Sequence, residues 1–257
     1  MRCRTVYPAW FSPAGTTRTV VERVSAGLGE IGGHCDLLEH PPEGEVSLPA
    51  GALLVAGAPV YAGRLPAIAA QRFSMLKGND TPAVALAVYG NREYEDALLE
   101  LCDILEGNGF WIVAAGAAVG QHSIFPNTAA GRPDEADLAK LDDFARSCVQ
   151  KLETSAGTKT RPAVKGTFPY RKPANVSFYP VGSERCTGCG ACSRICPAGA
   201  IDPARPRETD KERCIPCGAC IRVCPTGARA FRGPVYTAAK EGFGLLYKVR
   251  KEPEFFF

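Results

Sequence analysis

Two cysteine runs near the end of the sequence constrain this chain more than any other feature. The first has the spacing Cys186-x2-Cys189-x2-Cys192-x3-Cys196 and is closed by Pro197. The second repeats this spacing with Cys214, Cys217, Cys220, Cys224 and Pro225. In a tight turn, three thiolates at two-residue intervals can reach three irons of one compact cluster. The spacing therefore predicts two four-iron, four-sulfur clusters.

The fourth cysteine of each run is expected to cross over and bind the other cluster. Gly188, Gly190 and Gly218 place no side chain against the clusters, so the backbone can approach them closely. Their positions also leave amide N–H groups free to face sulfur. The alternative is structural zinc, which takes four ligands, usually from two CxxC hooks, and two proline-closed runs of four cysteines fit it poorly. The predicted ligands are Cys186, Cys189, Cys192 and Cys224 for the first cluster, and Cys214, Cys217, Cys220 and Cys196 for the second.

The other cysteines are scattered, and Cys35, Cys102 and Cys148 lie among apolar residues, as core thiols do. The start of the sequence has no apolar stretch of signal-peptide length, and the apolar stretches at residues 52–61 and 110–119 are too short to span a bilayer. We therefore expect a cytoplasmic protein without a membrane span. In that compartment, clustered cysteines bind metal rather than form disulfides.

Charge divides the chain into an acidic and a basic part. Residues 1–154 carry 12 Lys/Arg and 19 Asp/Glu, a net charge of −7. Residues 155–185 carry 6 and 1, and residues 186–257 carry 12 and 7, so each of these segments has a net charge of +5. Two four-iron clusters held by thiolates would add roughly −2 each. We expect the basic residues to offset this charge, and no nucleic-acid partner is predicted.

The first 154 residues alternate between continuous apolar runs, which buried parallel strands require, and segments with apolar residues at helical spacing. Gly107 is placed to end one helix, and Pro133 suits the first turn of another. This alternation predicts an α/β fold with a doubly wound, five-stranded parallel sheet and ligand loops at the carboxyl ends of its strands. The predicted strands are residues 5–11, 35–38, 52–60, 82–89 and 110–119, and the predicted helices are 16–31, 65–76, 94–106 and 133–152.

Residues 155–182 interrupt the alternation with four prolines and little periodicity, as a linker or wrapping arm does. We predict a sheet domain at residues 1–154, an arm at 155–182, a cluster module at 183–233 and a C-terminal extension at 234–257. The aromatic residues of the arm favour packing on the sheet domain. The opposite net charges of the arm and the sheet domain, +5 and −7, favour it as well. The alternative is a flexible tether. Packing would bring one cluster near the ligand loops, within one chain or across a homodimer.

Three loops at the predicted carboxyl ends of central strands suit an aromatic ligand that carries a phosphate. The first leads into a helix N-terminus, where hydroxyls and free N–H groups form an anion site; its alternative role is a plain helix N-cap. The other two combine glycine with aromatic side chains for stacking. The candidate residues are Ser12, Pro13, Ala14, Gly15, Thr16 and Thr17 in the first loop, Pro59, Val60, Tyr61 and Gly63 in the second, and Tyr89, Gly90, Asn91, Arg92 and Tyr94 in the third.

On these loops, residues 1–154 resemble flavodoxin, and the resemblance implies FMN bound across all three. Tyr61 stands where the family has an aromatic residue over the flavin ring, and Tyr94 matches a tyrosine that covers the other face. The family's phosphate loop reads Ser/Thr-x-Thr-Gly-Asn-Thr, whereas here Ala14 replaces the threonine and Thr16 the asparagine. One hydroxyl and one amide are thereby lost. The alternative is a flavodoxin-like domain with an empty or altered site.

The doubled cysteine run resembles the bacterial dicluster ferredoxin, which implies a small α+β fold with a pseudo-twofold repeat. Nearly the whole chain is similar to the flavodoxin–ferredoxin fusion family of anaerobes. The segments that carry the resemblance to the fusion family are Pro59-Val60-Tyr61-x-Gly63-Arg64, Tyr89-Gly90-Asn91-Arg92-x-Tyr94, His122-Ser123 and Arg250-Lys251-Glu252-Pro253-Glu254-Phe255.

Two further features have open roles. His122 follows the fifth strand near the expected flavin edge. It is either the candidate catalytic residue, as a proton donor to a flavin-bound substrate, or a hydrogen-bonding loop histidine. Phe255, Phe256 and Phe257 are either a frayed terminus or a hydrophobic plug against a domain surface.

The predicted function is electron transfer that couples one-electron steps through two clusters to FMN. One alternative is an FMN-dependent oxidoreductase that reduces a small organic substrate, with the clusters as its electron feed. Another is a redox subunit of a larger complex. No dinucleotide fingerprint stands between a strand and a helix. The expected partner is therefore a ferredoxin-like donor or an acceptor reductase rather than NAD(P)H.

Overall fold

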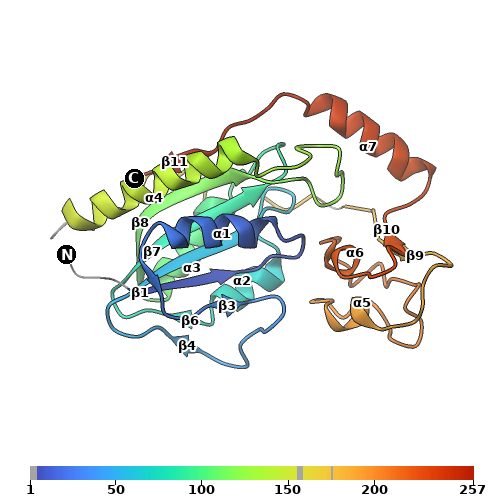
Figure 1. Cartoon of the computed structure of the whole chain (residues 1–257), viewed down its shortest axis with the longest axis horizontal. Helices are drawn as coiled ribbons and strands as arrows, with labels where there is room; N and C mark the ends of the chain where they lie inside the picture. The colour runs from blue at the N-terminus through green and yellow to red at the C-terminus, as the bar shows by residue number, and fades with distance from the viewer. Residues whose placement is uncertain (1–4, 155–158, 175) are drawn as a thin grey trace.

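A parallel sheet forms the centre of the sheet domain in the computed structural model, which describes residues 5–154, 159–174 and 176–257 (Figure 1). Its order is β11-β8-β7-β5-β1-β2, with β3 also beside β1. The strands that the sheet domain supplies reproduce the flavodoxin-like 2-1-3-4-5 order, so the predicted doubly wound sheet is confirmed. The bounds are β1 (Thr5–Trp10), β2 (Glu30–Ile31), β3 (Cys35–Asp36), β5 (Ala52–Pro59), β7 (Thr81–Tyr89), β8 (Phe110–Val119) and β11 (Glu254–Phe256).

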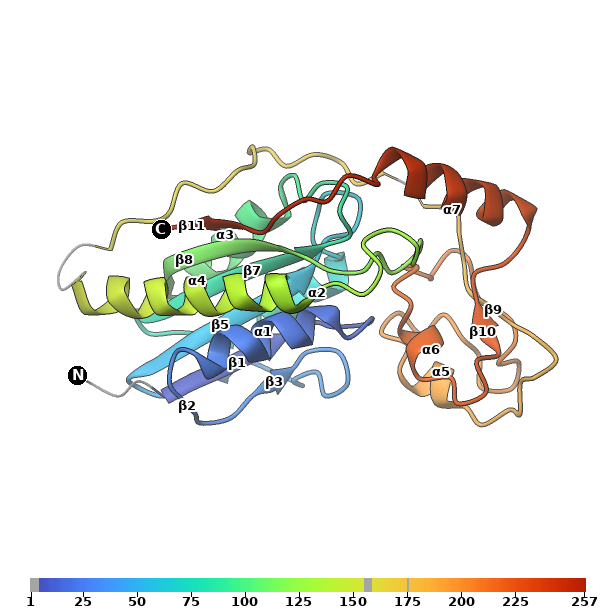
Figure 2. The same cartoon turned by 45° about the horizontal axis from the view of Figure 1, so that its top comes forward.

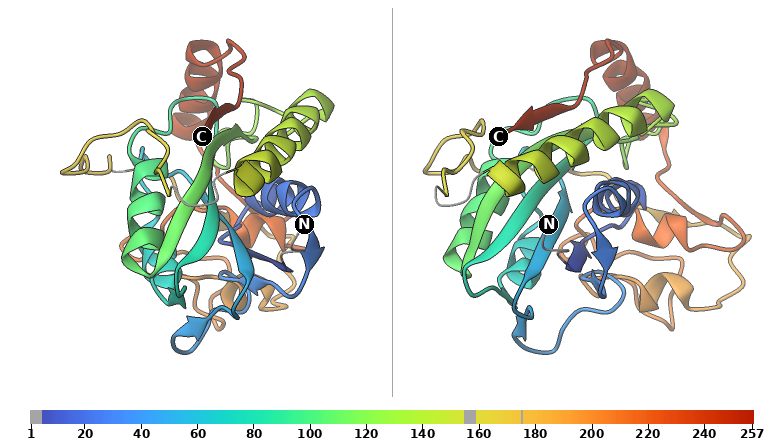
Figure 3. Two further views of the ribbon diagram at one scale, coloured as in Figure 1. Left: turned by 90° about the vertical axis from the view of Figure 1, so that its left-hand side faces the viewer. Right: turned by 60° about the vertical axis from the view of Figure 1, so that its left-hand side comes forward.

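Helices cover both faces of this sheet (Figure 3). One apolar layer joins the sheet to α1 (Thr16–Ala26) and α4 (Glu135–Thr154). The other joins it to α2 (Ala67–Phe73) and α3 (Ala97–Gly107). Every residue of β5 and β7 is buried, as their continuous apolar runs require. A separate two-stranded sheet pairs β4 (Val46–Ser47) with β6 (Leu76–Lys77).

Two predicted elements near the N-terminus are shorter than expected. The helix expected at residues 16–31 ends at Ala26, and Glu30–Ile31 forms β2 beside β1. A Cβ atom on Gly27 would lie 2.7 Å from the Cβ of Ala145, so the glycine allows the end of α1 to approach α4. The strand expected at residues 35–38 stops at Asp36, because its Oδ1 accepts hydrogen bonds from the N–H groups of Leu38 and Glu39.

The starts of two helices also differ from the prediction. The helix α3 begins at Ala97 rather than residue 94, after Glu95 with its φ of 44°. Pro133 lies before α4 rather than in its first turn. Asp134 caps this helix instead: the Asp137 N–H donates to Asp134 Oδ1 at 3.0 Å, and the Asp134 N–H donates to Asp137 Oδ2 at 2.9 Å. These are the reciprocal bonds of a capping box, formed here by two aspartates.

The C-terminal segment returns to the sheet domain. From α7 (Pro234–Leu246) the chain runs back to β11, which pairs antiparallel with β8 (Figure 2). Phe255 lies opposite Gly116 in this pairing and stacks on Phe144 at 4.4 Å between ring centroids. One of the two roles predicted for the phenylalanines was packing against a domain surface. Phe255 and Phe256 pack on the sheet domain in this way, as part of strand β11.

The cluster module consists of short elements at one end of the sheet domain (Figure 1). Its helices are α5 (Ala191–Arg194) and α6 (Ala219–Arg222), and β9 (Val181–Gly182) pairs antiparallel with β10 (Arg229–Ala230). The small α+β fold is as the ferredoxin resemblance implied. Among the helices described, none combines the length and apolar character needed to cross a membrane.

Candidate cofactor sites

A cavity of about 830 Å³ lies at the carboxyl ends of β1, β5, β7 and β8. Its volume is in the range of roughly 300–1,000 Å³ that is usual for cofactor and ligand sites. The strand order reverses between β1 and β5, where this fold class binds its ligands. Of the predicted loop residues, the cavity is lined by Pro13, Ala14, Thr16, Thr17, Pro59, Val60, Tyr61, Tyr89, Gly90 and Arg92.

The first loop presents a helix N-terminus to the cavity. Gly15 is the N-cap of α1, has a φ of 97°, and offers no side chain to the free N–H groups. No acidic residue stands in the first turn of α1, so an anion would meet no repulsion there. Ser12 does not line the cavity, because its Oγ accepts a hydrogen bond from the Arg18 N–H at 2.9 Å. Ser12 therefore satisfies one free N–H group of the first turn of α1 from outside the N-cap position, while Thr16 and Thr17 face the cavity.

Three predicted residues of the other loops hold the chain in place and do not line the cavity. Gly63 lies against Glu95, where any side chain would collide with the carboxylate. The Asn91 Nδ2 donates to the carbonyls of Tyr247 and Val249 at 2.7 and 2.8 Å. The interpretation that Tyr94 covers a flavin ring does not fit its position. Its side chain is 1% exposed, and its hydroxyl donates to Glu254 Oε2 at 2.9 Å.

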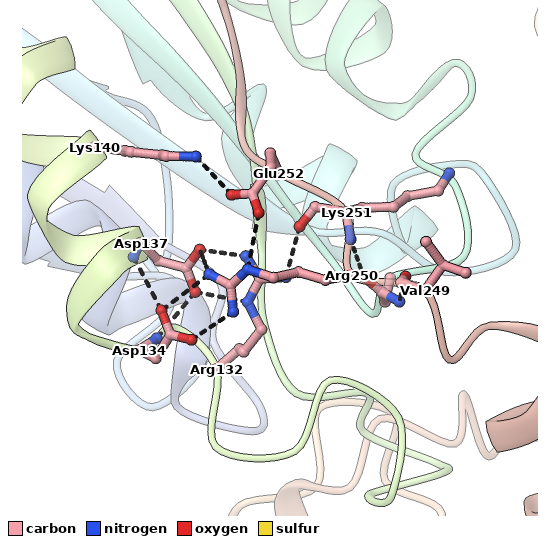
Figure 4. A network of polar contacts seen from close by, with 9 residues as sticks. Arg132, Asp134, Asp137, Lys140, Val249, Arg250, Lys251 and Glu252 are labelled. Atoms are coloured by element: carbon pink, nitrogen blue, oxygen red, sulfur yellow. Dashed lines mark hydrogen bonds and ion pairs between the residues drawn. The ribbon is translucent and has the colours of Figure 1, made fainter.

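An ionic network fixes the same returning segment to the start of α4 (Figure 4). Arg132 pairs with Asp137, and both side chains are buried. The Arg132 Nη1 also donates to the Lys251 carbonyl at 2.6 Å, and Arg250 pairs with Asp134 at 2.6 Å. We call these residues, 132, 134, 137 and 250–251, the C-terminal latch. The latch holds α7 and β11 beside the third loop.

His122 lies in the cavity wall with its ring packed on Phe125 and Phe243. Its Nδ1 accepts hydrogen bonds from the N–H groups of Ile124 and Phe125, both at 3.1 Å. Burial, together with the nearby Arg92 cation, lowers the pKa of His122 to about 4. The ring is therefore neutral at pH 7, and the proton belongs on Nε2. Its contacts are those of a hydrogen-bonding loop histidine.

The remaining wall of the cavity comes from segments that the sequence did not assign to it. The arm, the cluster module and α7 together close the side opposite the sheet. Phe178 and Tyr179 were predicted only as packing aromatics of the arm, whereas Phe243 carried no signal beyond its apolar character. These added lining residues include Arg171, Pro173, Ala174, Val176, Ser177, Phe178 and Tyr179 of the arm, Lys211, Glu212, Cys214, Ile215 and Pro216 of the cluster module, and Phe243.

The arm packs along α3, as Figure 2 shows. Arg161 forms ion pairs with Asp103 and Glu106, both at 2.6 Å. The Asp96 carboxylate accepts from the N–H groups of Thr167 and Arg171, at 2.9 and 2.8 Å. The packed arm is therefore found in the part that the structure describes, rather than the flexible tether. The prediction for residues 155–158 lies outside the described residues.

The two cysteine runs have the same local conformation. Gly190 and Gly218 are the N-caps of α5 and α6, with φ of 73° and 78°. The N–H groups of Ala200 and Ala228 donate to the sulfurs of Cys196 and Cys224, each at 3.2 Å. These left-handed glycines and N–H···S contacts are what thiolate ligands of a cluster require, so the donor set fits two iron–sulfur clusters.

The two predicted ligand sets differ in burial. In the first set Cys189 is exposed and Cys192 is buried, whereas in the second set both Cys217 and Cys220 are buried. Burial raises the pKa of the Cys214 and Cys217 thiols to about 12, so iron binding must displace their protons. Among described side chains, no three His, Cys, Asp or Glu residues converge on a position for one metal ion.

Direct contacts join the second cysteine run to the loops of the sheet domain. The Tyr61 hydroxyl donates to the Cys217 carbonyl at 3.4 Å, and burial raises the pKa of this tyrosine well above its usual value. Arg222 of α6 donates through Nε to the Pro13 carbonyl at 2.8 Å and pairs with Glu39 at 2.6 Å. The cluster module is thus fixed against the first two cavity loops.

Comparison with known proteins supports the reading of the cysteine runs. Residues 185–228 match a family described as the 4Fe-4S dicluster domain, so this segment is an iron–sulfur dicluster domain. Among curated proteins there is no match to the chain.

Several solved structures are similar to the sheet domain. Flavodoxin 1 from Bacillus cereus is 16% identical, with a TM-score of 0.44, over 57% of this chain and 97% of its own. A flavodoxin from the domain Archaea is 10% identical, with a TM-score of 0.38, over 58% and 99%. The apo form of an NADH:FMN oxidoreductase is 16% identical, with a TM-score of 0.42, over 62% and 94%.

The strand order of this chain itself, rather than these low identities, defines its flavodoxin-like fold. A flavodoxin-like domain and a 4Fe-4S dicluster domain in one chain agree with the fusion that the sequence predicted.

Proposed function

We propose that this chain is an electron-transfer protein that couples two [4Fe–4S] clusters to FMN. The FMN phosphate would bind at the N-terminus of α1, where Thr16 and Thr17 face the cavity. The flavin ring would lie between the second and third loops, near Tyr61 and Tyr89. The clusters would take the cysteine ligands predicted from the repeat. FMN supplies a centre that holds one or two electrons, and each cluster passes one.

One observation carries this proposal: the second cysteine run lines the same cavity as the phosphate loop. Cys214, Ile215 and Pro216 form part of the wall that Thr16 and Tyr61 also form. The Tyr61 hydroxyl links this wall to the Cys217 carbonyl. Electron transfer slows steeply with distance, so a cluster in the cavity wall is placed to exchange electrons with a flavin. One chain also keeps both centres at a high effective concentration.

The difference in burial between the two ligand sets favours an order of the centres along the route. The exposed Cys189 would hold the first cluster near the surface, where a partner protein can approach. Cys214 would hold the second cluster beside the cavity that it lines. A ferredoxin-like donor or an acceptor reductase would therefore exchange electrons with the first cluster, and the second cluster would connect it to FMN.

The alternative of an FMN-dependent oxidoreductase needs a group that delivers a proton to the substrate. His122 is the candidate, but its low pKa and neutral ring make it a hydrogen-bond donor through Nε2 rather than an acid at pH 7. This observation favours the electron carrier. A redox subunit of a larger complex would use the same internal route.

The route can be tested by stopped-flow reduction of the anaerobically purified, full-length protein. Reduced ferredoxin would serve as the donor, and flavin and cluster absorbance would be followed together. In Cys217→Ser, iron and sulfide content should fall and flavin reduction should slow strongly. In Cys35→Ser, which changes a cysteine outside both runs, neither should change. Flavin reduction should also be independent of protein concentration. Equally fast flavin reduction in Cys217→Ser, with its second cluster missing, would contradict the proposal.

A further inference from the structure

The internal repeat gives the cluster module two equivalent faces, one for each cysteine run. The sheet domain packs on the face of the second run, where Cys217 and Ala219 are buried in the apolar layer that joins the sheet to α2 and α3. At the equivalent positions of the first run, Cys189 is exposed and Ala191 is half-buried. The first run therefore presents to solvent the kind of surface that the second run presents to the sheet domain.

The polar contacts of the two faces differ in the same way. Arg194 and Arg222 stand at equivalent positions of the repeat. Arg222 pairs with Glu39 of the sheet domain at 2.6 Å, and the Cys217 carbonyl accepts from a hydroxyl of that domain at 3.4 Å. In the first run, the Cys189 carbonyl accepts from Arg194 Nη1 at 3.1 Å, and Arg194 is exposed. Among the ion pairs of the described residues, none includes Arg194, so its charge is available to a carboxylate from outside.

Two more exposed arginines belong to the first half of the module. Arg185 donates through Nη2 to the Gly227 carbonyl at 2.7 Å, and Arg207 donates through Nη2 to the Glu184 carbonyl at 3.4 Å. Both guanidinium groups thus bind backbone carbonyls, and neither belongs to an ion pair within the described part of the chain. Glu184 is the only acidic residue of the sequence between residues 182 and 201. The first half therefore carries more unpaired cations than carboxylates.

The face of the first run is also more polar than that of the second. Ile215 packs on the sheet domain, whereas its equivalent in the first run is Thr187, which is exposed. Permanent interfaces between proteins are more apolar than transient ones. The exchange of isoleucine for threonine therefore suits a partner that binds and leaves, rather than a permanent contact with a second copy of this chain.

We propose that the exposed side of the first cysteine run is the docking face for an acidic electron-transfer protein. This docking face consists of Arg185, Cys189, Ala191, Arg194 and Arg207. The partner presents a carboxylate to Arg194, as Glu39 does to Arg222. The acidic sheet domain binds the second run in this way, and both runs would hold clusters of the same charge. The inference rests on the clusters of the proposed function, and it adds the surface and the chemistry of the partner.

The test is isothermal titration calorimetry of the anaerobically purified, full-length protein, with an oxidised acidic bacterial ferredoxin as the probe. Arg194→Gln should weaken binding by about twofold to fivefold, as the loss of one exposed ion pair implies. Arg194→Glu should weaken it further, because repulsion replaces attraction, and Arg194→Lys should retain most of the affinity. Lys248→Gln is the matched control, because it removes one positive charge beside the third loop and should leave the affinity nearly unchanged. In the unaltered protein, affinity should fall as salt rises.

The proposal is overturned if Arg194→Glu retains its clusters and binds the ferredoxin as tightly as the unaltered protein does. It is also overturned if the unaltered protein does not bind the ferredoxin at low salt. If the Arg194 variants lose iron, Arg207→Gln and the salt dependence of the unaltered protein decide, because Arg207 contacts the Glu184 carbonyl rather than a cysteine. Affinity that is unchanged in Arg207→Gln and independent of salt would contradict the docking face.

Sedimentation velocity tests the other possible occupant of this face. A dimer of the unaltered protein that Arg194→Glu dissociates would show that the face joins two copies of the chain, and the proposal would be wrong. The proposed function can fail separately. Protein without iron and sulfide would refute the clusters themselves, whereas intact clusters with unchanged ferredoxin binding in the Arg194 variants would refute only the docking face.

Discussion

The sheet domain and the cluster module are stabilised in different ways. In the sheet domain, β5 and β7 are buried along their whole length, and two apolar layers pack the helices on them. In the cluster module, the apolar cluster around the cysteines has only Cys192, Ile201 and Cys220 as buried members. Small domains bury too little surface to fold easily without metals or disulfides. The sheet domain therefore forms its site by packing, whereas the module depends on its ligands.

Removing iron should produce the largest effect, and it tests this comparison directly. Before treatment, the protein should contain about eight iron and eight sulfide per chain. After chelation, the cluster module should unfold because its buried centre consists largely of ligand cysteines. Limited proteolysis should then cut within residues 185–228 and leave a fragment of the sheet domain. Equal resistance of this segment with and without iron would show that packing alone suffices there.

Breaking the C-terminal latch should destabilise the sheet domain. Asp137→Ala would leave the Arg132 cation buried without its partner, a change that typically costs about 3–5 kcal/mol. Urea unfolding followed in the sheet domain measures this loss. Asp143→Ala is the matched control on α4, because Asp143 pairs with Arg146 at the surface and its loss should cost less than about 1 kcal/mol. Equal effects of the two substitutions would mean that the latch adds nothing beyond a surface pair.

Charge at the phosphate loop should affect FMN binding without affecting the fold. Ala14 is exposed and lines the cavity, so Ala14→Asp places a carboxylate near the expected phosphate. Repulsion of about 1–4 kcal/mol at contact distance would weaken FMN binding by roughly fivefold or more. Fluorescence titration of flavin-free protein measures the dissociation constant, and Ala14→Asn is the uncharged control. Unchanged affinity in Ala14→Asp would place the phosphate elsewhere.

Acid should release the C-terminal segment, with a smaller effect than the loss of Asp137. The Arg250 cation holds the pKa of Asp134 well below its usual range, so this carboxylate favours the folded state at neutral pH. A depressed pKa gives a contribution that is complete above the unfolded-state value of about 4 and is lost as pH falls below it. Hydrogen exchange of β11 should therefore quicken below about pH 4. Arg250→Gln should remove this pH step, and a step of the same size in that variant would exclude Asp134 as its cause.

Much of the fold followed from local sequence, and the errors have specific causes. Continuous apolar runs identified β5, β7 and β8 because both faces of these strands are buried. The end of α1 was missed because the apolar spacing continues past Ala26, whereas Gly27 lies where α1 meets α4. The strand β11 was missed because edge pairing depends on where the chain returns, which local periodicity does not encode.

The candidate sites show the same difference between features that local sequence predicts and features that only packing decides. The phosphate loop was predicted because a loop before a helix places its residues at that helix's N-terminus, whatever surrounds it. Tyr94 was assigned to the flavin from a spacing shared with a family. In this fold, however, the acceptor for its hydroxyl is Glu254, which comes from the chain end. The arm and Phe243 were not predicted as cavity walls, because nothing in their local sequence marks the distant loops they face.

By itself, the sequence determined the metal chemistry and the order of the elements. Cysteine spacing is a local property that decides which thiolates can share a cluster, and apolar spacing decides which segments are strands. The tertiary structure alone decided that the second cysteine run shares a cavity with Thr16 and Tyr61, and that Arg222 of the cluster module pairs with Glu39 of the sheet domain. Both contacts join residues far apart in the chain. They depend on how the arm and the C-terminal segment pack, which is a property of the whole molecule.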